Sequence, residues 1–281
     1  MGDPEGIGPE VIRKALKSPR ISRLAYFICI GNQKLFKALP VSVVDVPYKT
    51  AGEGALRSLE RGMTLVKAGI ADALVTAPLS KERVSRYQTN FVGHTEYLAQ
   101  AFDVNNFDMM FIGPKIRLSL VTRHVPIKDV PGLITKKAVL ASIELMQETL
   151  RSHFKIRRPR IAVLGLNPHA GENGLLGKED LKQIVPAIAA ARKKGIQVQG
   201  PFPADTFFYK NRGFDGVVAM YHDQGLAPVK ALYFKELVNF TAGLPFVRTS
   251  PVHGTAFDIA GRGIADPSSM VAAIELACRL A

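Results

Sequence analysis

Apolar and polar positions along the chain form two kinds of segment in alternation. Short β-rich apolar runs are separated by longer segments in which apolar residues recur at helical spacing. The predicted strands are residues 24–31, 41–46, 73–77, 116–122, 160–166 and 215–220. The clearest predicted helices are residues 51–69, 135–153, 179–194 and 268–280, the last with Ser268 and Ser269 as candidate caps. This alternation predicts an α/β fold.

Length and composition narrow the class of protein. The 281 residues exceed the usual size of one compact core, so one large α/β domain or two lobes around a cleft is expected. No linker rich in Pro, Gly and Ser divides the chain, so two lobes would share a sheet or exchange strands. The longest apolar runs fall far short of the roughly 20 residues that span a bilayer. The N-terminus has no feature of a secretory signal, so a cytoplasmic protein is expected.

The two cysteines and the net charge say less about the function of the protein. Cys29 and Cys278 stand outside any metal-ligand spacing and are predicted to be free thiols. The formal charge of +13 favours anionic partners of any kind. A nucleic-acid site would need a basic stripe interleaved with stacking aromatics, which this sequence does not show. The basic run at residues 155–160 is therefore interpreted as a solvated loop.

Three histidines each follow a predicted strand directly. They are His124 in VTRHVP, His169 in LGLNPHAGE and His222 in AMYHDQG. A lone histidine is more often a hydrogen-bonded loop or core residue, but three in such loops could converge on one point. Three imidazoles with open positions are typical of a catalytic divalent metal site, for which zinc, magnesium, manganese or cobalt would serve.

Two aspartates stand close to these histidines in the sequence. Asp223 follows His222, and Asp205 lies in GPFPADTFF. Either could orient an imidazole or complete the metal shell, and either could equally be a helix cap. A metal at this place would hold a substrate hydroxyl and lower its pKa, so that its carbon can release hydride.

Five further residues are candidates for binding an anion. His94 and Thr95 begin a helix-like segment, where free N–H groups favour negative charge, although Thr95 could be only an N-cap. Lys230, Asn239 and Arg248 supply two cations and an amide that could grip phosphate and carboxylate, although each alone is more often a surface residue. The N-terminal GDPEGIGPE has no Walker lysine and the chain has no GxGxxG after a strand, so neither a P-loop nor a Rossmann fingerprint is present.

Seven motifs follow one another along the chain: GDPEGIGPE, ADALVTAPLSKE, GHTEYLA, RHVP, LNPHAGE, YHDQGLAPVK and HGTAFDIAGRGIADP. In this order they resemble the 4-hydroxythreonine-4-phosphate dehydrogenase family over nearly the whole chain. The resemblance implies an isocitrate/isopropylmalate dehydrogenase-like fold, with two α/β lobes around a central cleft, and not a classical Rossmann fold. It also implies a homodimer with the active site at the interface. The approximate lobes are residues 1–120 plus 240–281 on the cofactor side and residues 121–239 on the metal and dimer side.

Residue by residue, the resemblance assigns roles to the candidates. It makes His124, His169 and His222 the metal ligands, one of them contributed across the dimer interface. It assigns His94, Thr95, Lys230, Asn239 and Arg248 to the substrate. The implied reaction is NAD-dependent oxidation of 4-phosphooxy-L-threonine (4-hydroxythreonine 4-phosphate) at C3, then decarboxylation to 3-amino-2-oxopropyl phosphate, in pyridoxal phosphate (vitamin B6) biosynthesis. Catalytic candidates are Lys230, Asp205 and Asp223, with a metal-bound water as a further candidate for the base.

The segment HGTAFDIAGRGIADP also resembles the segment with which isopropylmalate dehydrogenases hold the adenosine part of NAD. The resemblance points to His253, Gly254, Ala256, Asp258 and Asp266 as cofactor contacts. Two positions depart from that relative: Phe257 replaces a proline, and Asp266 replaces an asparagine. The family also has a short β-strand before GDPEGIGPE, and loss of that strand would expose a sheet edge.

Three other functions are weighed against this one. A paralogue acting on 4-phospho-D-threonate or 4-phospho-D-erythronate would keep the phosphate and the alcohol, and would differ in one or two contacts around C2. A phosphate acyltransferase of the same fold would need neither NAD nor metal, and the three loop histidines argue against it. A basic nucleic-acid-binding protein rests on net charge alone.

Overall fold

The computed structural model describes residues 1–37, 39–209 and 213–281. The chain forms two compact units: unit 1 comprises Met1–Asn105 and Lys235–Ala281, and unit 2 comprises Asn106–Phe234. These bounds differ from the lobes expected near residues 120 and 240. The cause is strand pairing. β4 (Asp108–Gly113) forms a hairpin with β5 (Ile116–Leu120), and β9 (Val238–Ala242) pairs with β10 (Val247–Pro251).

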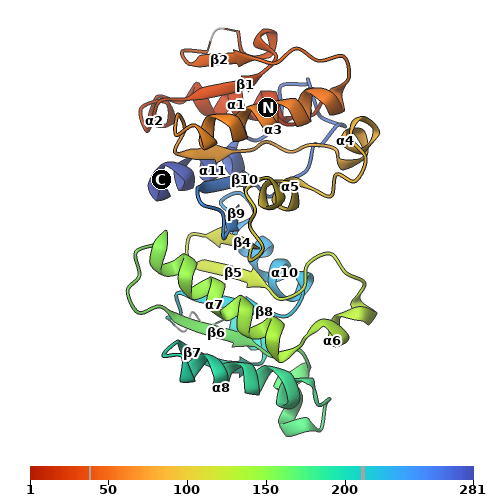
Figure 1. Cartoon of the computed structure of the whole chain (residues 1–281), viewed down its shortest axis with the longest axis vertical. Coiled ribbons are helices and arrows are strands. Elements are labelled where there is room, and N and C mark those ends of the chain that lie inside the picture. Colours follow the sequence, from red (N-terminus) through yellow and green to blue (C-terminus); the bar gives the residue numbers. More distant parts are fainter. Residues whose placement is uncertain (38, 210–212) are drawn as a thin grey trace. The chain divides into compact units, whose positions relative to one another are not determined.

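Unit 1 carries two small groups of strands among helices (Figure 1). Its first segment contains α1 (Gly8–Leu16), α2 (Pro19–Ser22), β1 (Ile28–Gly31), η1 (Gln33–Phe36), β2 (Ser42–Asp45), α3 (Ala51–Lys67), β3 (Ala73–Val75), α4 (Lys81–Tyr87) and α5 (His94–Ala101). Its second segment contains β9 (Val238–Ala242), β10 (Val247–Pro251) and α11 (Ser268–Leu280). β1 pairs in parallel with β2, and β10 lies between parallel β3 and antiparallel β9. Helix α11 packs against β10 and α1.

Unit 2 is built on a mixed sheet in the order β4-β5-β8-β6-β7 (Figure 1). Its elements are β4 (Asp108–Gly113), β5 (Ile116–Leu120), η2 (Ile127–Asp129), α6 (Val130–Leu133), α7 (Lys136–Ser152), β6 (Arg160–Leu164), η3 (Pro168–Gly174), η4 (Asp180–Ile184), α8 (Val185–Lys193), β7 (Gln197–Phe202), α9 (Ala204–Phe207), β8 (Gly216–Ala219) and α10 (His222–Tyr233). Only the β4–β5 pair is antiparallel. The other neighbours run in parallel, so the loops that follow β5, β8 and β6 leave the sheet at one edge.

Helix α7 shows why the longer elements were predictable. Its apolar residues Val139, Ile143, Met146 and Leu150 recur at spacings of three and four, and all four are completely buried. Burial of each such side chain contributes about 1.5–3 kcal/mol. The side chain of Thr135 caps the helix by accepting a hydrogen bond from the N–H of Ala138, at 3.1 Å.

Four strands, β4, β7, β9 and β10, lie outside the predicted ranges. β4 contains Asp108 and two methionines, which favour strands less than β-branched residues do. β7 combines Gln197 and Gln199 with a Gly-Pro pair, a composition that is tolerated because β7 lies at the end of the strand order in unit 2. In the part of the chain that the structure describes, no helix is long and apolar enough to cross a membrane.

Candidate active site

Two of the three loop histidines meet in unit 2. β5 and β8 are parallel neighbours, and their pairing continues past their ends, where the N–H of Thr122 donates to the carbonyl of Met220 at 3.0 Å. The chain segments that follow therefore leave the sheet side by side. His124 lies on one segment and His222 begins α10 on the other, with their ring centroids 5.6 Å apart. The predicted convergence is thus observed for this pair.

Asp223 contacts the ring of His222. Its Oδ1 lies 2.6 Å from Nδ1 of His222. A carboxylate at one ring nitrogen fixes the tautomer and leaves Nε2 as the nitrogen that can bind a metal. Two imidazoles, one of them held by a carboxylate, are a donor set that suits zinc and other divalent first-row metals.

His169 projects from an unusual turn. Residues 169–173 all have positive φ, from 42° at Glu172 to 78° at Gly171. Four of these five carry a Cβ, for which the left-handed conformation costs roughly 1–2 kcal/mol each. The imidazole of His169 is two-thirds exposed, and its Nδ1 lies 3.7 Å from Oε2 of Glu172. Within residues 1–37, 39–209 and 213–281, no group of three or more His, Cys, Asp or Glu is arranged to hold a metal ion.

Asp180, which the sequence did not single out, holds this turn together. Its carboxylate is 1% exposed and accepts hydrogen bonds from the N–H of Leu166 at 2.9 Å and the N–H of Asn167 at 3.1 Å. It also accepts one from the side-chain amide of Asn167 at 3.0 Å. At Gly165 a Cβ would lie 2.8 Å from Oδ1 of Asp180, so glycine allows the turn to close. Apolar periodicity reveals buried hydrophobic residues and gives no sign that an aspartate is buried. The sequence pattern therefore did not reveal Asp180.

The other catalytic candidates of unit 2 lie on helices. Asp205 is exposed in the first turn of α9, which packs against the segment that carries His169. Lys230 is half-buried in the last turn of α10. It lies eight residues after His222, about 12 Å along the helix axis.

Arg248 is the most informative residue of unit 1. It lies on β10, is 2% exposed, and donates to two hydroxyls, Oγ1 of Thr241 at 3.0 Å and Oγ1 of Thr76 at 2.7 Å. Its Nε has no hydrogen-bond partner among the described residues, and none of their carboxylates forms an ion pair with it. Desolvation lowers the pKa of Arg248 to about 10. A buried cation whose hydrogen-bond partners are both neutral is costly, so this geometry favours an anionic ligand.

Neighbouring residues complete this anion-binding group. Asn239 lies two residues before Thr241 on β9, on the same face of the strand. His94 and the buried Thr95 open α5. Desolvation, and then the charge of Arg248, lower the pKa of His94 well below its usual value, so its imidazole is neutral at pH 7. Four of the five predicted substrate residues thus belong to unit 1, and Lys230 belongs to unit 2.

The predicted cofactor residues lie in the loop between β10 and α11, which α1 holds in place. The carboxylate of Glu10 accepts hydrogen bonds from the N–H of Gly263 at 3.3 Å and Ala265 at 2.9 Å. Lys14 donates to the carbonyls of both residues. Glu10 and Lys14 were not singled out from the sequence, because an i,i+4 acid–base pair on a helix is usually a solvated one. His253, Gly254, Ala256 and Asp258 all lie in the first half of this loop.

Asp266 has a structural task in the same loop. Its Oδ1 accepts a hydrogen bond from the N–H of Ser268 at 2.9 Å, and its Oδ2 forms an ion pair with Lys235 at 3.1 Å. The hydrogen bonds of Ser268 and the contact with Lys235 lower the pKa of Asp266 to about 2. Asp266, and neither Ser268 nor Ser269, therefore supplies the capping side chain at the start of α11, which corrects the expectation from the sequence.

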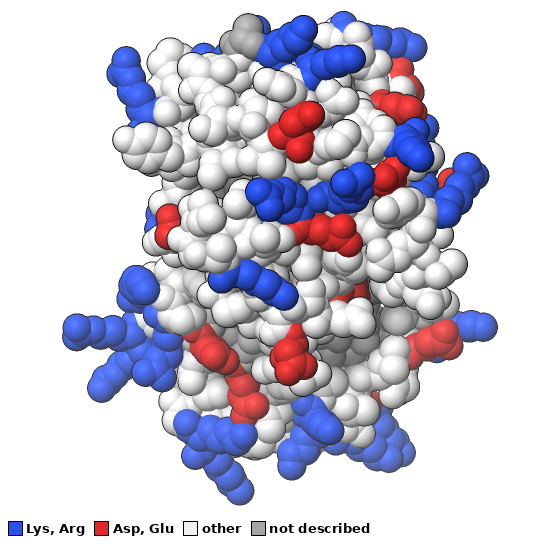
Figure 2. Space-filling model, turned by 45° about the horizontal axis from the view of Figure 1, so that its top comes forward, with Lys and Arg blue, Asp and Glu red and all other residues white. Residues whose placement is uncertain are grey.

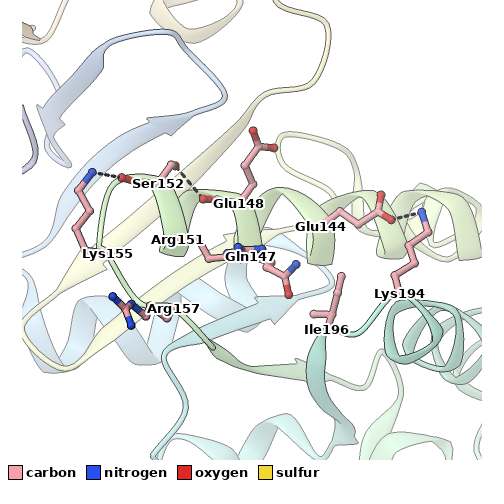
Figure 3. Close-up of a pocket in the computed structure, with 9 residues that line it drawn as sticks. All are labelled: Glu144, Gln147, Glu148, Arg151, Ser152, Lys155, Arg157, Lys194 and Ile196. Atoms are coloured by element: carbon pink, nitrogen blue, oxygen red, sulfur yellow. Dashed lines mark hydrogen bonds and ion pairs between the residues drawn. The ribbon is translucent and has the colours of Figure 1, made fainter.

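A hollow of about 740 Å³ lies at the end of α7 in unit 2 (Figure 3). Its lining mixes cations with the carboxylates of Glu144 and Glu148, and Lys194 forms an ion pair with Glu144. Lys155 donates to the carbonyl of Ser152 at 2.6 Å. The basic run at residues 155–160 is mostly exposed, as predicted. Figure 2 likewise shows acidic and uncharged side chains between the Lys and Arg of the face that it draws.

The sequence matches the profile of the family described as "Pyridoxal phosphate biosynthetic protein PdxA" over residues 14–277. The chain belongs to this family. It is 38% identical over 310 residues to the 4-hydroxythreonine-4-phosphate dehydrogenase of Sulfurihydrogenibium sp. (strain YO3AOP1), covering 100% of the chain and 96% of that relative. It is 41% identical over 320 residues to an Oceanobacillus iheyensis protein provisionally named D-threonate 4-phosphate dehydrogenase, covering 100% and 96%.

Solved structures agree with this membership in the PdxA family. The crystal structure of 4-hydroxythreonine-4-phosphate dehydrogenase from Klebsiella pneumoniae matches with a TM-score of 0.84 and 38% identity, covering 99% of the chain and 96% of that structure. An isocitrate dehydrogenase from Methylococcus capsulatus matches with a TM-score of 0.51 at 16% identity, covering 96% and 80%, a likeness of fold alone. The family and the isocitrate dehydrogenase-like α/β fold that the sequence predicted are therefore confirmed. The protein is an oxidoreductase of the PdxA family.

Proposed function

We propose that this protein is a metal-dependent, NAD-linked dehydrogenase that oxidises 4-phosphooxy-L-threonine at C3 and releases carbon dioxide to form 3-amino-2-oxopropyl phosphate. The observation that carries the proposal is the buried Arg248, whose partners are neutral hydroxyls. A phosphorylated substrate supplies the missing negative charge. Relatives named 4-hydroxythreonine-4-phosphate dehydrogenase match over 100% and 99% of the chain.

Two groups of residues are proposed to act on different parts of the substrate. His94, Thr95, Asn239 and Arg248 bind its anionic groups, and neutral His94 accepts or donates one hydrogen bond without adding charge. The pair His124 and His222 serves the alcohol carbon. A divalent ion held by these imidazoles would supply the Lewis acidity that lowers the pKa of the hydroxyl and stabilises the negative charge of decarboxylation.

Individual side chains then have definite tasks. Asp223 accepts the Nδ1 proton of His222 and keeps Nε2 available as a ligand. Lys230 and Asp205 are the side chains proposed to accept the C3 hydroxyl proton, and Lys230 would also bind the substrate. The loop between β10 and α11, which Glu10 and Lys14 hold in place, is proposed to bind NAD. The proposed contact residues are His253, Gly254, Ala256, Asp258 and Asp266.

His169 is proposed to act in a homodimer. The exposed imidazole of His169 does not join the pair formed by His124 and His222 within the described part of one chain. The family resemblance implies that one ligand comes from the second subunit. We therefore assign His169 to the metal site that contains the histidine pair of the partner.

The proposal is tested by following NADH absorbance with the purified protein. The substrate is 4-phosphooxy-L-threonine, and the assay is repeated after treatment with a chelator and after zinc or magnesium is restored. The expected result is NADH formation that the chelator abolishes and the metal restores. Turnover that is insensitive to chelation, or no turnover of any phosphorylated substrate, would contradict the proposal.

A second candidate function is oxidation of 4-phospho-D-threonate or 4-phospho-D-erythronate. It is favoured by the relative from Oceanobacillus iheyensis, which is as similar to the chain as the relatives named for the amino-acid substrate. The same anion-binding residues and the same histidines would serve it, since only the group at C2 differs. A higher kcat/KM for 4-phospho-D-threonate than for 4-phosphooxy-L-threonine in the same assay would establish it.

A further inference from the structure

The motif ADALVTAPLSKE has no task of its own in the proposed function, although it connects two cations of unit 1. Its first part contains β3 and Thr76, whose N–H donates to the carbonyl of Thr249 at 3.0 Å. Pairing with β10 therefore continues past β3, and it brings Oγ1 of Thr76 to 2.7 Å from the guanidinium of Arg248. Its last part begins α4 at Lys81, where the hydroxyl of Ser80 caps the helix. The motif thus runs from the contact with Arg248 to a second cation.

Lys81 lies against the start of α5. At Gly93, the N-cap of α5, a Cβ would lie 3.2 Å from Cε and 3.4 Å from Nζ of Lys81, so glycine leaves room for this side chain. No side chain caps α5, and Lys81 is exposed, so a ligand can reach both. The first N–H groups of a helix carry partial positive charge, so a cation beside them is unfavourable unless an anion accompanies it.

The charges around Gly93 do not balance. One carboxylate is present, since a Cβ at Gly93 would lie 3.1 Å from Oε2 of Glu96. Within the described part of the chain, Glu96 forms no ion pair with Lys81 or with Arg248. Desolvation lowers the pKa of His94 most, and the charges of Arg248 and Lys81 lower it further, so both cations act on the same imidazole. Two cations against one carboxylate leave one positive charge beside the start of α5.

This combination suits a phosphate group. A phosphate monoester carries a charge of about −1.5 to −2 at pH 7, which offsets the remaining cation and the partial charge of the helix start together. A lysine ammonium binds phosphate as a point charge, and helix N-termini are common phosphate sites. Buried Arg248, whose Nε has no hydrogen-bond partner among the described residues, is an independent sign that an anion binds beside His94.

We propose that Lys81 is a further substrate-binding residue, which contacts the phosphate of the substrate at the start of α5 and makes the protein select phosphorylated substrates. The inference rests on the proposed function, because it names a residue that recognises the phosphate of the proposed substrate. Lys81, Gly93 and the first turn of α5 all belong to unit 1, so one subunit supplies this contact.

The test first measures binding without turnover. Lys81→Met removes the charge at nearly the same side-chain length, and Lys81→Arg keeps the charge. Calorimetric titration of the full chain with inorganic phosphate should give a Kd about tenfold higher for Lys81→Met, with Lys81→Arg between this variant and the unaltered protein. Arg86→Met is the matched control, because Arg86 lies on the same helix and is paired with Glu82 at the surface. Equal phosphate affinity of Lys81→Met and the unaltered protein, or no phosphate binding at all, would overturn the inference.

Steady-state kinetics then connect Lys81 to the substrate. The KM for 4-phosphooxy-L-threonine should rise about tenfold in Lys81→Met with kcat nearly unchanged, because the phosphate is bound equally in the ground state and the transition state. An equal loss for 4-hydroxy-L-threonine, which has no phosphate, would refute the contact with the phosphate. Phosphate binding that depends on Lys81 without any NADH formation would uphold the phosphate contact and refute the dehydrogenase. NADH formation with an unchanged KM in Lys81→Met would do the reverse.

Discussion

At the scale of single residues, Arg248 departs from the usual behaviour of its type because it is almost completely buried. Charged side chains are almost never fully buried unless an opposite charge accompanies them. Here two threonine hydroxyls hold the guanidinium at 3.0 and 2.7 Å, so the orientation of the side chain is fixed before any ligand arrives. Such a preorganised cation binds an anion with little reorganisation, since the cost of desolvation is already part of the folded state.

Arg248→Met tests this reading. Loss of the charge should lower kcat/KM for the phosphorylated substrate by at least about 30-fold, which corresponds to about 2 kcal/mol. The free energy of unfolding should not fall, because the variant also removes a buried charge. Steady-state kinetics and urea unfolding measure the two effects. A variant that lost stability but kept its kcat/KM would show that Arg248 is structural.

His94 provides a prediction for pH. Its folded-state pKa lies well below the unfolded value near 6.5, so the unfolded state binds the proton first. The stability that depends on neutral His94 is complete above pH 6.5 and declines as the pH falls below it. His94→Gln should therefore reduce the loss of unfolding free energy between pH 6.5 and 5. His153→Gln is the positive control: burial also lowers the pKa of His153, away from the site, so this variant should reduce the loss as well. If the unfolding free energy of His94→Gln fell with pH as steeply as that of the wild type, the lowered pKa of His94 would be refuted.

At the scale of elements, the turn that carries His169 has a strained backbone. Five successive residues adopt positive φ, and the buried carboxylate of Asp180 compensates with three hydrogen bonds. Backbone strain of this kind persists only where the surrounding structure fixes it, and it is concentrated at functional sites. The turn leaves the imidazole of His169 two-thirds exposed, as binding to a partner subunit would require.

Asp180→Ala should collapse this turn. The variant leaves the N–H groups of Leu166 and Asn167 without their acceptor, and we expect the free energy of unfolding to fall by about 2–3 kcal/mol. Metal-dependent turnover should fall with it, because His169 is no longer held. Urea unfolding and a zinc titration of activity would measure both. Glu179→Ala is the control, since Glu179 contacts the same Asn167 side chain from the surface. If Asp180→Ala kept the metal dependence of the wild type, the turn would have no role at the metal site.

At the scale of the whole molecule, the proposed site needs two chains. His124 and His222 are brought together by parallel neighbouring strands within unit 2, while His169 stays outside that pair among the described residues. A homodimer in which each site takes the pair from one subunit and His169 from the other would be symmetric and closed.

Mixing two inactive variants tests this arrangement. His169→Ala and His222→Ala should each abolish metal-dependent NADH formation when alone. After unfolding and refolding together, half of the dimers should be mixed and each mixed dimer should contain one intact site, so activity should return to about a quarter of the wild type. Refolding each variant alone is the control. Activity that never returns would refute a shared site, and high activity of His169→Ala alone would remove His169 from the ligands.

The sequence by itself determined what depends on local pattern. The helices of residues 51–67, 136–152 and 268–280 follow from apolar periodicity and capping, and the ordered motifs predicted the family and fold that the comparisons confirm. The site residues were predicted from their chemical type and from their position just after predicted strands, where open α/β folds expose polar loops.

Only the tertiary structure decided which of these residues meet and what surrounds them. Strand order, which the sequence does not encode locally, placed His124 beside His222. Burial of Arg248 among hydroxyls and the acceptor role of Asp180 depend on contacts between residues far apart in the chain. Periodicity reports which face of one element is apolar, but it carries no information on the partner of a buried polar group, and this is the physical reason that these features appeared only in the folded chain.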